Sequence, residues 1–434
     1  MIDAIVRRHR EDLLNVVFVQ GCNKLNGGFL KSADRGNLAQ GNNLEDLRKS
    51  NFSTVLRAIH RARSISRSEL SAMTGLNRST ISALVGGLST RNLVNEVSEN
   101  TSKKVGRPST VVQANENTIA IAVNPEIDAV TVGVIGLGGH VHKRIRFETT
   151  GPPTIKETIK ITAAIIDGLT SISENYLQIV GIGLAVPGMI RKLDGFVKIA
   201  PHLGWKDAPI VQMMENAVGF RTKAANDAFL GALAERTFGP GSGIADMVYM
   251  NGGPSGIGGG IIAGGYVVSG IGGYAGELGH IRVTIDGEPD SAKLRGTLEA
   301  EVTREKLLSA LNLESADFDE LDHALRTSQS PAVLNEVTRQ LEYLGQAIAS
   351  LTNLLNPQLI ILGGFLGSIY SMDTRQVQTI VSRETLTPNH ENVRIARATL
   401  GVNQVILGAA ELVFQGLFDD PMAQPFGKIP KLSS

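Results

Sequence analysis

The chain has 434 residues, 42% of them hydrophobic, and a formal net charge of zero. This length corresponds to about three domains of ~150 residues, and the hydrophobic content excludes an intrinsically disordered chain. No apolar run approaches the ~18–20 residues of a membrane span. Charges within the first twenty residues argue against a signal peptide. The single cysteine, Cys22, excludes intrachain disulfides and a cysteine-rich zinc module, and it fits a reducing cytoplasm.

Charge is unevenly distributed along the chain. Residues 1–110 carry about 17 Lys and Arg against about 9 Asp and Glu, and most of the excess lies in 51–110. This asymmetry indicates a nucleic-acid-binding surface at one end, with a solvated basic face as an equally weighted alternative. Residues 21–44 are rich in Gly, Asn and Ser, so we assign 1–50 to a flexible N-terminal extension.

Two short helices joined by a glycine turn are expected after residue 51. Ser66 and Glu69 form a capping-box pattern that starts a helix near Arg67, with Leu70 and Met73 pointing inward. A second helix follows the turn at Gly75 and is capped by Asn77. Its buried stripe consists of Ile81, Leu84, Val85 and Leu88. The pattern is that of a helix-turn-helix whose second helix reads the major groove of DNA.

The DNA-contacting residues follow from this arrangement. Those expected to face the major groove are Arg78, Ser79, Thr80 and Ser82. Leu93–Val97 and Val111-Val112 are expected to pair as a wing hairpin with Lys103 and Lys104 at its tip. Arg107, restrained by Pro108, lies in an extended basic segment suited to the minor groove or the phosphates. We therefore assign 51–112 to a winged helix-turn-helix DNA-binding domain.

From residue 113 onward the pattern becomes α/β. Strands are expected at 119–123, 130–135, 180–185, 247–251, 259–263 and 359–362. Helices are expected at 154–173, 297–311, 330–354 and 402–418. Because several of these strands end in glycine turns, we expect an α/β sheet with ligand sites at the strand ends.

Three motifs in this region could carry chemistry. The loop 251–262 has glycines that could let backbone N–H groups approach an anion, or could simply allow tight packing: Gly256, Gly258, Gly259 and Gly260. Asp227, after Asn226, could accept a proton or hydrogen bonds from a sugar, although a helix cap is the simpler interpretation. Glu277 and His280, three apart on one helix face, could both contact a polyol, and a structural histidine is the alternative.

Taken together and in order, the motifs resemble the ROK family of repressors and sugar kinases. They lie at 184–189, 203–205, 226–228, 255–260 and 277–280, at Gly296 with Glu299, and at 356–357 before 363–364. The resemblance implies a two-lobed, actin-like and sugar-kinase-like domain over 113–434. The preceding helix-turn-helix places the chain among the family's transcriptional regulators. The sugar contacts that it implies are Pro187, Gly188, Asn226, Asp227, Glu277, His280 and Glu299, with Asp227 matching the catalytic base of the kinases.

Two segments depart from the family pattern. After the first strand of the sheet, family kinases have a glycine-rich phosphate loop, and this chain has 124–128, in which Glu126 and Asp128 would repel a triphosphate. In the family's zinc loop, the three cysteine positions are taken by Asp290, Ala292 and Thr297, which leaves His280 as the remaining ligand. We therefore expect no catalytic residues in use, no cofactor and no structural zinc. The zinc loop must then be held by packing and hydrogen bonds, or be more mobile.

The sequence thus predicts a cytoplasmic transcriptional regulator of carbohydrate metabolism, more often a repressor in such families. Its expected partners are operator DNA and a sugar or sugar phosphate bound between the lobes, with no membrane, and it is expected to form a homodimer or homotetramer. A sugar kinase with an appended DNA-binding module is the first alternative. The second is a ligand-independent DNA-binding protein whose pocket is a relic.

Overall fold

The structure is a computed structural model that describes residues 44–98, 110–172 and 178–423. The chain forms two compact units, Met1–Arg48 and Lys49–Ser434. The second unit contains the two three-stranded and two five-stranded sheets described below and all candidate site residues. Lys103, Lys104 and Arg107, which we predicted at the wing and linker, lie outside the described residues, as does most of the predicted N-terminal extension. The predicted domain boundary at 112/113 stays a prediction.

The N-terminal elements follow the sequence signals closely. They are α2 (Leu44–Ala62), β1 (Ser64–Ser66), α3 (Arg67–Thr74), α4 (Arg78–Thr90), β2 (Val94–Ser98) and β3 (Thr110–Ala114). Ser66 and Glu69 form the capping box of α3, and Gly75 ends this helix with a φ of 71°. The Asn77 side chain accepts the N–H of Thr80 and starts α4. The predicted strands therefore pair, since β3 lies between β1 and β2 in a three-stranded antiparallel sheet.

Two details of this part differ from the prediction. Met73 was expected inside but is 67% exposed, because α3 is only eight residues long and buries Leu70 alone. The third strand, β1, was not predicted, since three residues with one buried side chain give no periodic signal. The stripe predicted for α4 is buried in full.

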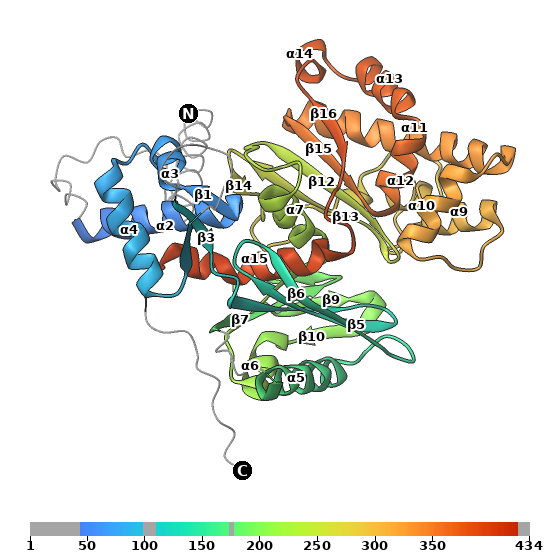
Figure 1. The fold of residues 1–434 in the computed structure, drawn as a ribbon. Coiled ribbons are helices and arrows are strands. Elements are labelled where there is room, and N and C mark those ends of the chain that lie inside the picture. The colour runs from blue at the N-terminus through green and yellow to red at the C-terminus, as the bar shows by residue number, and fades with distance from the viewer. Residues whose placement is uncertain (1–43, 99–109, 173–177, 424–434) are drawn as a thin grey trace, which may run out of the picture. The chain divides into compact units, whose positions relative to one another are not determined.

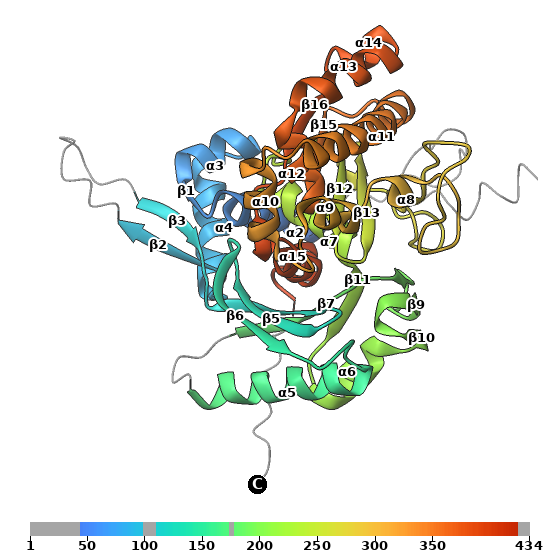
Figure 2. The same cartoon turned by 90° about the vertical axis from the view of Figure 1, so that its right-hand side faces the viewer.

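The remainder contains two five-stranded sheets with the same strand arrangement (Figures 1 and 2). The first has the order β11-β7-β4-β5-β6, and the second the order β16-β15-β12-β13-β14. In each, a three-stranded antiparallel meander is extended by two parallel strands. The strands of the first sheet are β4 (Thr118–Pro125), β5 (Ala129–Gly136), β6 (His140–Glu148), β7 (Gln178–Val186) and β11 (Thr222–Asn226). Those of the second are β12 (Met247–Gly253), β13 (Gly256–Ala263), β14 (Tyr266–Val267), β15 (Leu359–Gly363) and β16 (Arg394–Arg397).

Helices connect and cover these sheets. A small sheet, β8 (Met189–Ile190), β9 (Val197–Ala200) and β10 (Trp205–Ala208), follows β7. The helices are α5 (Ile155–Ile172), α6 (Ile210–Val218), α7 (Asp227–Phe238), α8 (Leu298–Glu301), α9 (Arg304–Leu311), α10 (Phe318–Thr327), α11 (Pro331–Leu355), α12 (Gly364–Met372), α13 (Thr374–Glu384), α14 (Thr387–His390) and α15 (Gln404–Asp419), with short 3-10 helices η1 (Pro201–Leu203), η2 (Leu278–His280) and η3 (Gly401–Asn403). The helix predicted over 297–311 is two helices, because Thr303 caps α9 and breaks the run.

The last helix of each half packs on the sheet of the other half. α7 leaves the first sheet and lies against β13, where a Cβ at Gly258 would be 2.6 Å from the Cβ of Ala228. α15 leaves the second sheet and lies against β7, where a Cβ at Gly183 would be 2.0 Å from the carbonyl oxygen of Ala409. The two helices cross where a Cβ at Gly408 would meet the Leu230 carbonyl oxygen at 1.9 Å. We call α7 and α15 the exchanged helices, because each packs on the sheet of the other half. The glycines allow their backbones a close approach that any side chain at these positions would prevent.

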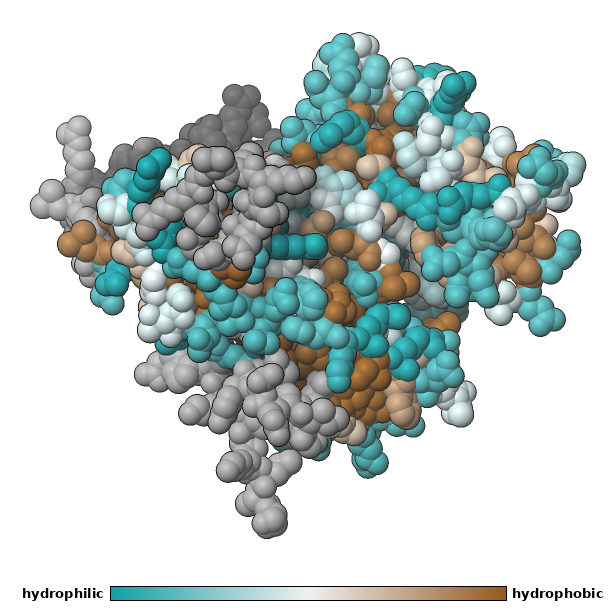
Figure 3. Space-filling view, viewed as in Figure 1, coloured by the Kyte–Doolittle hydropathy of each residue, from teal (hydrophilic) through white to brown (hydrophobic). Residues whose placement is uncertain are grey.

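The core under α15 continues into the N-terminal helices. One buried cluster joins residues of α2, α3 and α4 to Ile135 and Leu137 and to the apolar face of α15. By length and composition, Gly401–Asp419 could cross a membrane, but 61% of it is buried, as in the core helix of a globular protein. It was the single candidate span among the described residues. The face of the molecule in Figure 3 is mainly hydrophilic, with hydrophobic residues in smaller groups between.

Glu235 is a buried carboxyl group between α7 and the start of α15. Its Oε1 accepts hydrogen bonds from the N–H groups of Thr399 and Leu400 and from the Gln404 amide, at 3.1, 3.2 and 3.1 Å. Its Oε2 is buried and has no hydrogen-bond partner among the described residues. Desolvation raises the pKa of Glu235 to about 7, although the backbone N–H groups act in the opposite direction.

We predict that the stability of the protein falls between pH 5 and pH 8 because of Glu235. The folded state binds this proton more tightly than the unfolded chain, whose glutamate pKa is near 4.5, so raising the pH through this window withdraws stabilisation. Each unit of pKa difference corresponds to ~1.4 kcal/mol. Glu235→Gln keeps an oxygen acceptor and cannot ionise, so it should flatten the pH dependence of the unfolding free energy measured in urea. The exposed Glu305→Gln is the control, and an unchanged slope in Glu235→Gln would refute the assignment.

Candidate functional site

Asn226 and Asp227 lie where β11 passes directly into α7. The Asn226 side chain accepts the N–H of Phe229 at 3.0 Å and donates to the carbonyl oxygen of Gly188 at 3.2 Å, which ties this corner to the end of β7. Asp227 Oδ1 accepts the N–H of Ala228 at 2.9 Å. The structure gives the helix cap to Asn226 rather than to Asp227, where we expected it, and the proton- or sugar-binding role of Asp227 stays a prediction. Burial raises the pKa of Asp227.

The charges of His280, Asp227 and Glu299 all act on the carboxyl group of Glu277, so we treat these four residues as one candidate site. Desolvation raises the pKa of Glu277, His280 lowers it, and the negative charges of Asp227 and Glu299 raise it further. Glu277 precedes the 3-10 helix η2 with a non-helical backbone and makes no side-chain capping bond, so Glu277 and His280 do not share one helix as expected, and their joint contact with a polyol stays a prediction. His202, on η1, also acts on Asp227. Sequence reasoning missed His202, although it directly precedes the 203–205 motif.

The segment that carries zinc in other proteins of this pattern is held here by hydrogen bonds. His280 Nδ1 and the Thr297 hydroxyl each lie 2.8 Å from Asp290 Oδ2. Asp290 Oδ1 accepts the N–H groups of Ala292 and Leu294 at 2.9 and 2.8 Å. Burial acts to raise the pKa of Asp290, but these hydrogen bonds outweigh it and lower the pKa. Two of the three residues at the expected cysteine positions, Asp290 and Thr297, are thus hydrogen-bonded to each other. The Asp290 carboxylate also accepts a hydrogen bond from His280.

The glycine loop is largely explained by packing. Gly258 and Gly260 face α7, where added Cβ atoms would lie 2.6 and 2.5 Å from the side chains of Ala228 and Ala232, and Gly259 faces Leu278. Gly256 has a φ of 128°, and a Cβ there would lie 2.2 Å from Glu299 Oε2. Glu299 Oε2 in turn accepts the N–H of Ile257 at 2.9 Å. The Glu299 carboxylate therefore already accepts the N–H of Ile257 in this loop. Binding of an anion by these glycines stays a prediction.

The equivalent hairpin of the first sheet, between β4 and β5, is closed by its own side chains. Glu126 accepts the Thr131 hydroxyl at 2.7 Å. Arg146 on β6 reaches Glu126 Oε2 at 3.4 Å and Asp128 Oδ1 at 2.7 Å. The predicted negative charges are thus present but paired with one arginine. The loop that would receive a nucleotide phosphate is a compact turn rather than an open cradle.

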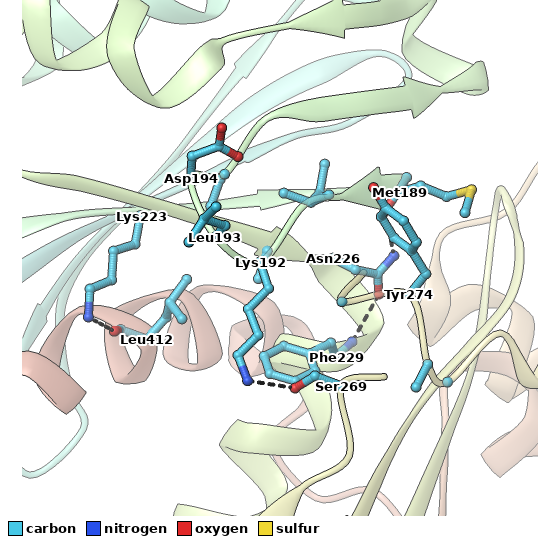
Figure 4. Close-up of a pocket in the computed structure, with 18 of the residues that line it drawn as sticks. Met189, Lys192, Leu193, Asp194, Lys223, Asn226, Phe229, Ser269, Tyr274 and Leu412 are labelled. Atoms are coloured by element: carbon cyan, nitrogen blue, oxygen red, sulfur yellow. Dashed lines mark hydrogen bonds between the residues drawn. The ribbon is translucent and has the colours of Figure 1, made fainter. Parts of the chain in front are cut away.

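A cavity of about 350 Å³ adjoins the site (Figure 4). Its lining includes five predicted site residues: Gly188, Asn226, Gly258, Gly259 and Glu277. Pro187, Asp227, His280, Glu299, Gly256 and Gly260 do not line it. Sequence reasoning missed the other lining residues, among them Lys192, Phe229, Tyr274 and Leu412. They come from four separate elements with no motif of their own, so only the folded chain reveals them.

The predicted DNA-contacting residues of α4 differ in their availability. Arg78 and Ser79 are exposed, and Thr80 is half-buried. The Ser82 hydroxyl accepts a hydrogen bond from Arg67 Nη1 at 3.3 Å, and Arg67 also holds both carboxylate oxygens of Glu96 on β2 at 2.7 Å. Arg67 was missed because its sequence position reads only as a helix start. It links α3, α4 and the β2–β3 hairpin on one surface.

A buried histidine on α2, His60, contacts both α15 and the turn between β5 and β6. His60 is 1% exposed, and its Nε2 lies 2.6 Å from Oε1 of the buried Glu411 on α15. Its Nδ1 accepts the N–H of Gly138 in the β5–β6 turn at 2.9 Å. An N–H can only donate, so Nδ1 carries the lone pair and Nε2–H donates to Glu411. Arg57 adds hydrogen bonds to Gln415 and Asp419 at 2.7 and 2.8 Å.

Comparison with known proteins gives consistent matches. The model of the ROK family matches residues 120–415. A putative xylose repressor from Caldicellulosiruptor sp. is 27% identical and covers 86% of this chain and 98% of its own. A glucokinase from Halalkalibacterium halodurans is 30% identical over 59% of this chain and 83% of its own. The crystal structure of a ROK family transcriptional regulator, a homologue of the Escherichia coli MLC protein, has the same fold, with a TM-score of 0.70 at 23% identity over 86% of this chain and 97% of that one.

We predict that Asp290 stabilises its loop without metal. Asp290→Ala leaves two backbone N–H groups and the Thr297 hydroxyl without their acceptor, which should cost ~1–3 kcal/mol of unfolding free energy. Urea denaturation measures this, and the exposed Asp286→Ala serves as control. A strong chelator should leave the melting temperature of the unmodified protein unchanged. A chelator-induced drop would show that a metal holds the loop after all.

Proposed function

Because the chain belongs to the ROK family, we propose that it is a sugar-responsive, DNA-binding transcriptional regulator of carbohydrate metabolism, acting as a repressor in the cytoplasm. The observation that carries this proposal is the packing of the helical N-terminal part onto α15 through His60 and Glu411. The same α15 lies against the sheet that supplies Asn226 and Asp227. The repressor names of full-length relatives support the same function.

We propose that residues 51–112 are a winged helix-turn-helix that binds operator DNA. The turn at Gly75, the capped helix α4 and the antiparallel pair β2–β3 have the order of such a module. Arg78 is exposed and forms no hydrogen bond with any described residue, so its guanidinium is available for a guanine edge. Lys103, Lys104 and Arg107 remain candidates for the phosphates and minor groove.

The ligand in this proposal is a sugar or sugar phosphate at the carboxylate cluster. Asp227, Glu277 and Glu299 offer acceptors to hydroxyl groups, and His280, whose Nδ1–H donates to Asp290, offers Nε2 as a further acceptor. Pro187, Gly188 and Asn226 form the inner wall of the same corner. Bound sugar would bridge groups from the two halves and so set their angle. In a homodimer or homotetramer, that angle fixes the spacing of two DNA-binding modules.

We also propose that the chain is not an enzyme. Phosphoryl transfer depends mainly on positioning the nucleotide and neutralising charge on its phosphates. The β4–β5 turn presents Pro125, which lacks an N–H, and Glu126 and Asp128, which already share Arg146. A base at Asp227 alone supplies only ~10²–10⁴-fold. The glucokinase relative keeps the alternative of a bifunctional sugar kinase open to test.

Two substitutions should separate the two binding functions of the full-length protein. An operator is first selected from a pool of random duplexes, and sugars are screened by thermal shift, beginning with xylose and glucose. Arg78→Ala should weaken operator binding by ~1–3 kcal/mol and relax its sequence preference, with sugar affinity unchanged. Asp227→Ala should lose at least tenfold in sugar affinity by calorimetry, since a hydrogen bond to a charged group contributes ~1.5–3 kcal/mol, with operator binding unchanged.

The regulator proposal fails if the intact protein selects no duplex, or if no sugar alters its affinity for the selected one. Unchanged sugar affinity in both Asp227→Ala and Glu277→Ala would instead place the sugar site elsewhere in the fold.

We predict no ATP-dependent phosphorylation of any sugar. A coupled ADP-release assay over a sugar panel at saturating Mg-ATP should give the same rate for the unmodified protein and Asp227→Ala. Turnover near ~1 s⁻¹, within the ordinary range for enzymes, that is abolished in Asp227→Ala would establish a kinase.

A further inference from the structure

The cavity beside Asn226 has a chemical character different from that of the carboxylate cluster. Its lining includes large apolar side chains together with the charged groups of Lys192, Asp194, Lys223 and Glu277; the apolar ones are Met189, Ile190, Leu193, Val211, Phe229 and Leu412. Leu193 is 91% exposed and Met189 is 37% exposed, so two of the apolar side chains that line the cavity are accessible to solvent. Large apolar groups that a fold leaves exposed beside a concave site favour an apolar ligand group.

The cavity is continuous with the proposed sugar site through two residues. Glu277 and Asn226 both line it, and Glu277 is also coupled electrically to Asp227, His280 and Glu299. Figure 4 shows Tyr274 beside Asn226, and two further lining residues, Phe229 and Leu412, come from α7 and α15. A ligand whose sugar ring sits at the carboxylates therefore points its substituent past Asn226 into apolar surroundings.

The volume is ample for an apolar ring. At ~30 Å³ for each water molecule, about 350 Å³ corresponds to roughly twelve waters, and an apolar cavity of ~150 Å³ already holds benzene. This lies at the lower end of the ~300–1,000 Å³ of small-molecule pockets. A free monosaccharide at the carboxylates would leave this space to water against apolar walls.

The walls of the cavity also include both exchanged helices near their crossing. Phe229 precedes Leu230, whose carbonyl oxygen faces Gly408, and Leu412 follows Glu411, the partner of His60. At the mouth, Lys192 donates to the Ser269 hydroxyl at 3.0 Å and joins the turn after β8 to the segment after β14. A group in this cavity thus contacts both halves of the fold beside the helix that carries the DNA-binding part.

We propose that the effector site extends into this cavity and that the effector is a glycoside, a sugar joined to an apolar group, rather than a free monosaccharide. This inference rests on the proposed function, because it assigns the sugar end to the carboxylate cluster. The apolar part of the ligand contacts Phe229 on α7 and Leu412 on α15, so its binding acts on α15 directly.

The test compares each free sugar with its own phenyl glycosides on the full-length protein. The probes are xylose and glucose, their phenyl α- and β-glycosides, and glucose 6-phosphate, measured by calorimetry and by release of the selected operator. We expect one phenyl glycoside to bind at least tenfold more tightly than its parent sugar, which equals about 1.4 kcal/mol, and to release the operator at correspondingly lower concentration.

Cavity-filling variants identify where the phenyl group lies. Leu412→Trp should remove the tenfold advantage of the glycoside and leave the affinity for the free sugar unchanged. Val211→Phe, on α6, should do the same from another wall, which keeps the test available if the α15 variant fails to fold. Leu386→Trp, at a 68% exposed leucine outside the cavity, is the matched control and should bind like the unmodified protein.

The outcomes separate this inference from the proposed function. Equal or weaker binding of every glycoside, with the free sugar still bound, overturns the extension and leaves the regulator intact. Tighter binding of glucose 6-phosphate with no gain from a phenyl group overturns it in favour of an anionic effector. A glycoside advantage that survives both cavity-filling variants also overturns it. Binding of no sugar and no glycoside overturns the sugar-responsive function together with the extension.

Discussion

The exchange of α7 and α15 between the two sheets is the constraint on which the other features depend. Each helix leaves its own sheet and packs on the opposite one, and they touch backbone to backbone at Leu230 and Gly408. A helix backbone can approach a strand this closely only where the strand lacks a side chain, as at Gly183 and Gly258. The two halves are therefore joined at this crossing. The corner Asn226-Asp227 lies at the start of one of these helices, so the proposed ligand site and the crossing share α7.

The exchange also explains why the N-terminal helices are fixed to the body. α15 presents one side to β7 and another to α2, and His60 completes the contact with a hydrogen bond on each ring nitrogen. A neutral imidazole between a backbone N–H and a carboxylate is a directional link that apolar packing alone does not provide. Arg57 extends the link along the same helix to Asp419. Residues of α2 are therefore tied both to the β5–β6 turn of the first sheet and to α15.

Local signals in the sequence predicted local structure well, and the comparisons confirmed the family and its sugar-kinase-like fold. The capping box at Ser66 and the left-handed turn at Gly75 are decided within a few residues, so they could be read directly. Gly260 was correctly placed in a strand, but Gly258, expected in the preceding loop, also belongs to β13. The helix α7 that packs against both glycines comes from the other half of the fold, which no local pattern reveals. Arg146, which neutralises Glu126 and Asp128, is eighteen residues from the nearer of them and contacts it only through strand pairing. The cavity was missed for the same reason, since its walls come from β8, α6, α7 and α15.

The link between His60 and Glu411 spans 351 residues of sequence, and this has a consequence during synthesis. The helices around Arg78 leave the ribosome early, whereas their buried partner on α15 is among the last elements made. At ~5–20 residues per second, the interval is roughly 20–70 s. For that time the proposed DNA-binding part lacks the α15 portion of the buried cluster to which Phe52, Val55 and Ile59 belong, and only the cluster residues of α3, α4 and the following strands are present to cover them. Chains that end before α15 would keep this surface exposed permanently. Premature termination would therefore yield an aggregation-prone product rather than a regulator that no longer responds to its ligand.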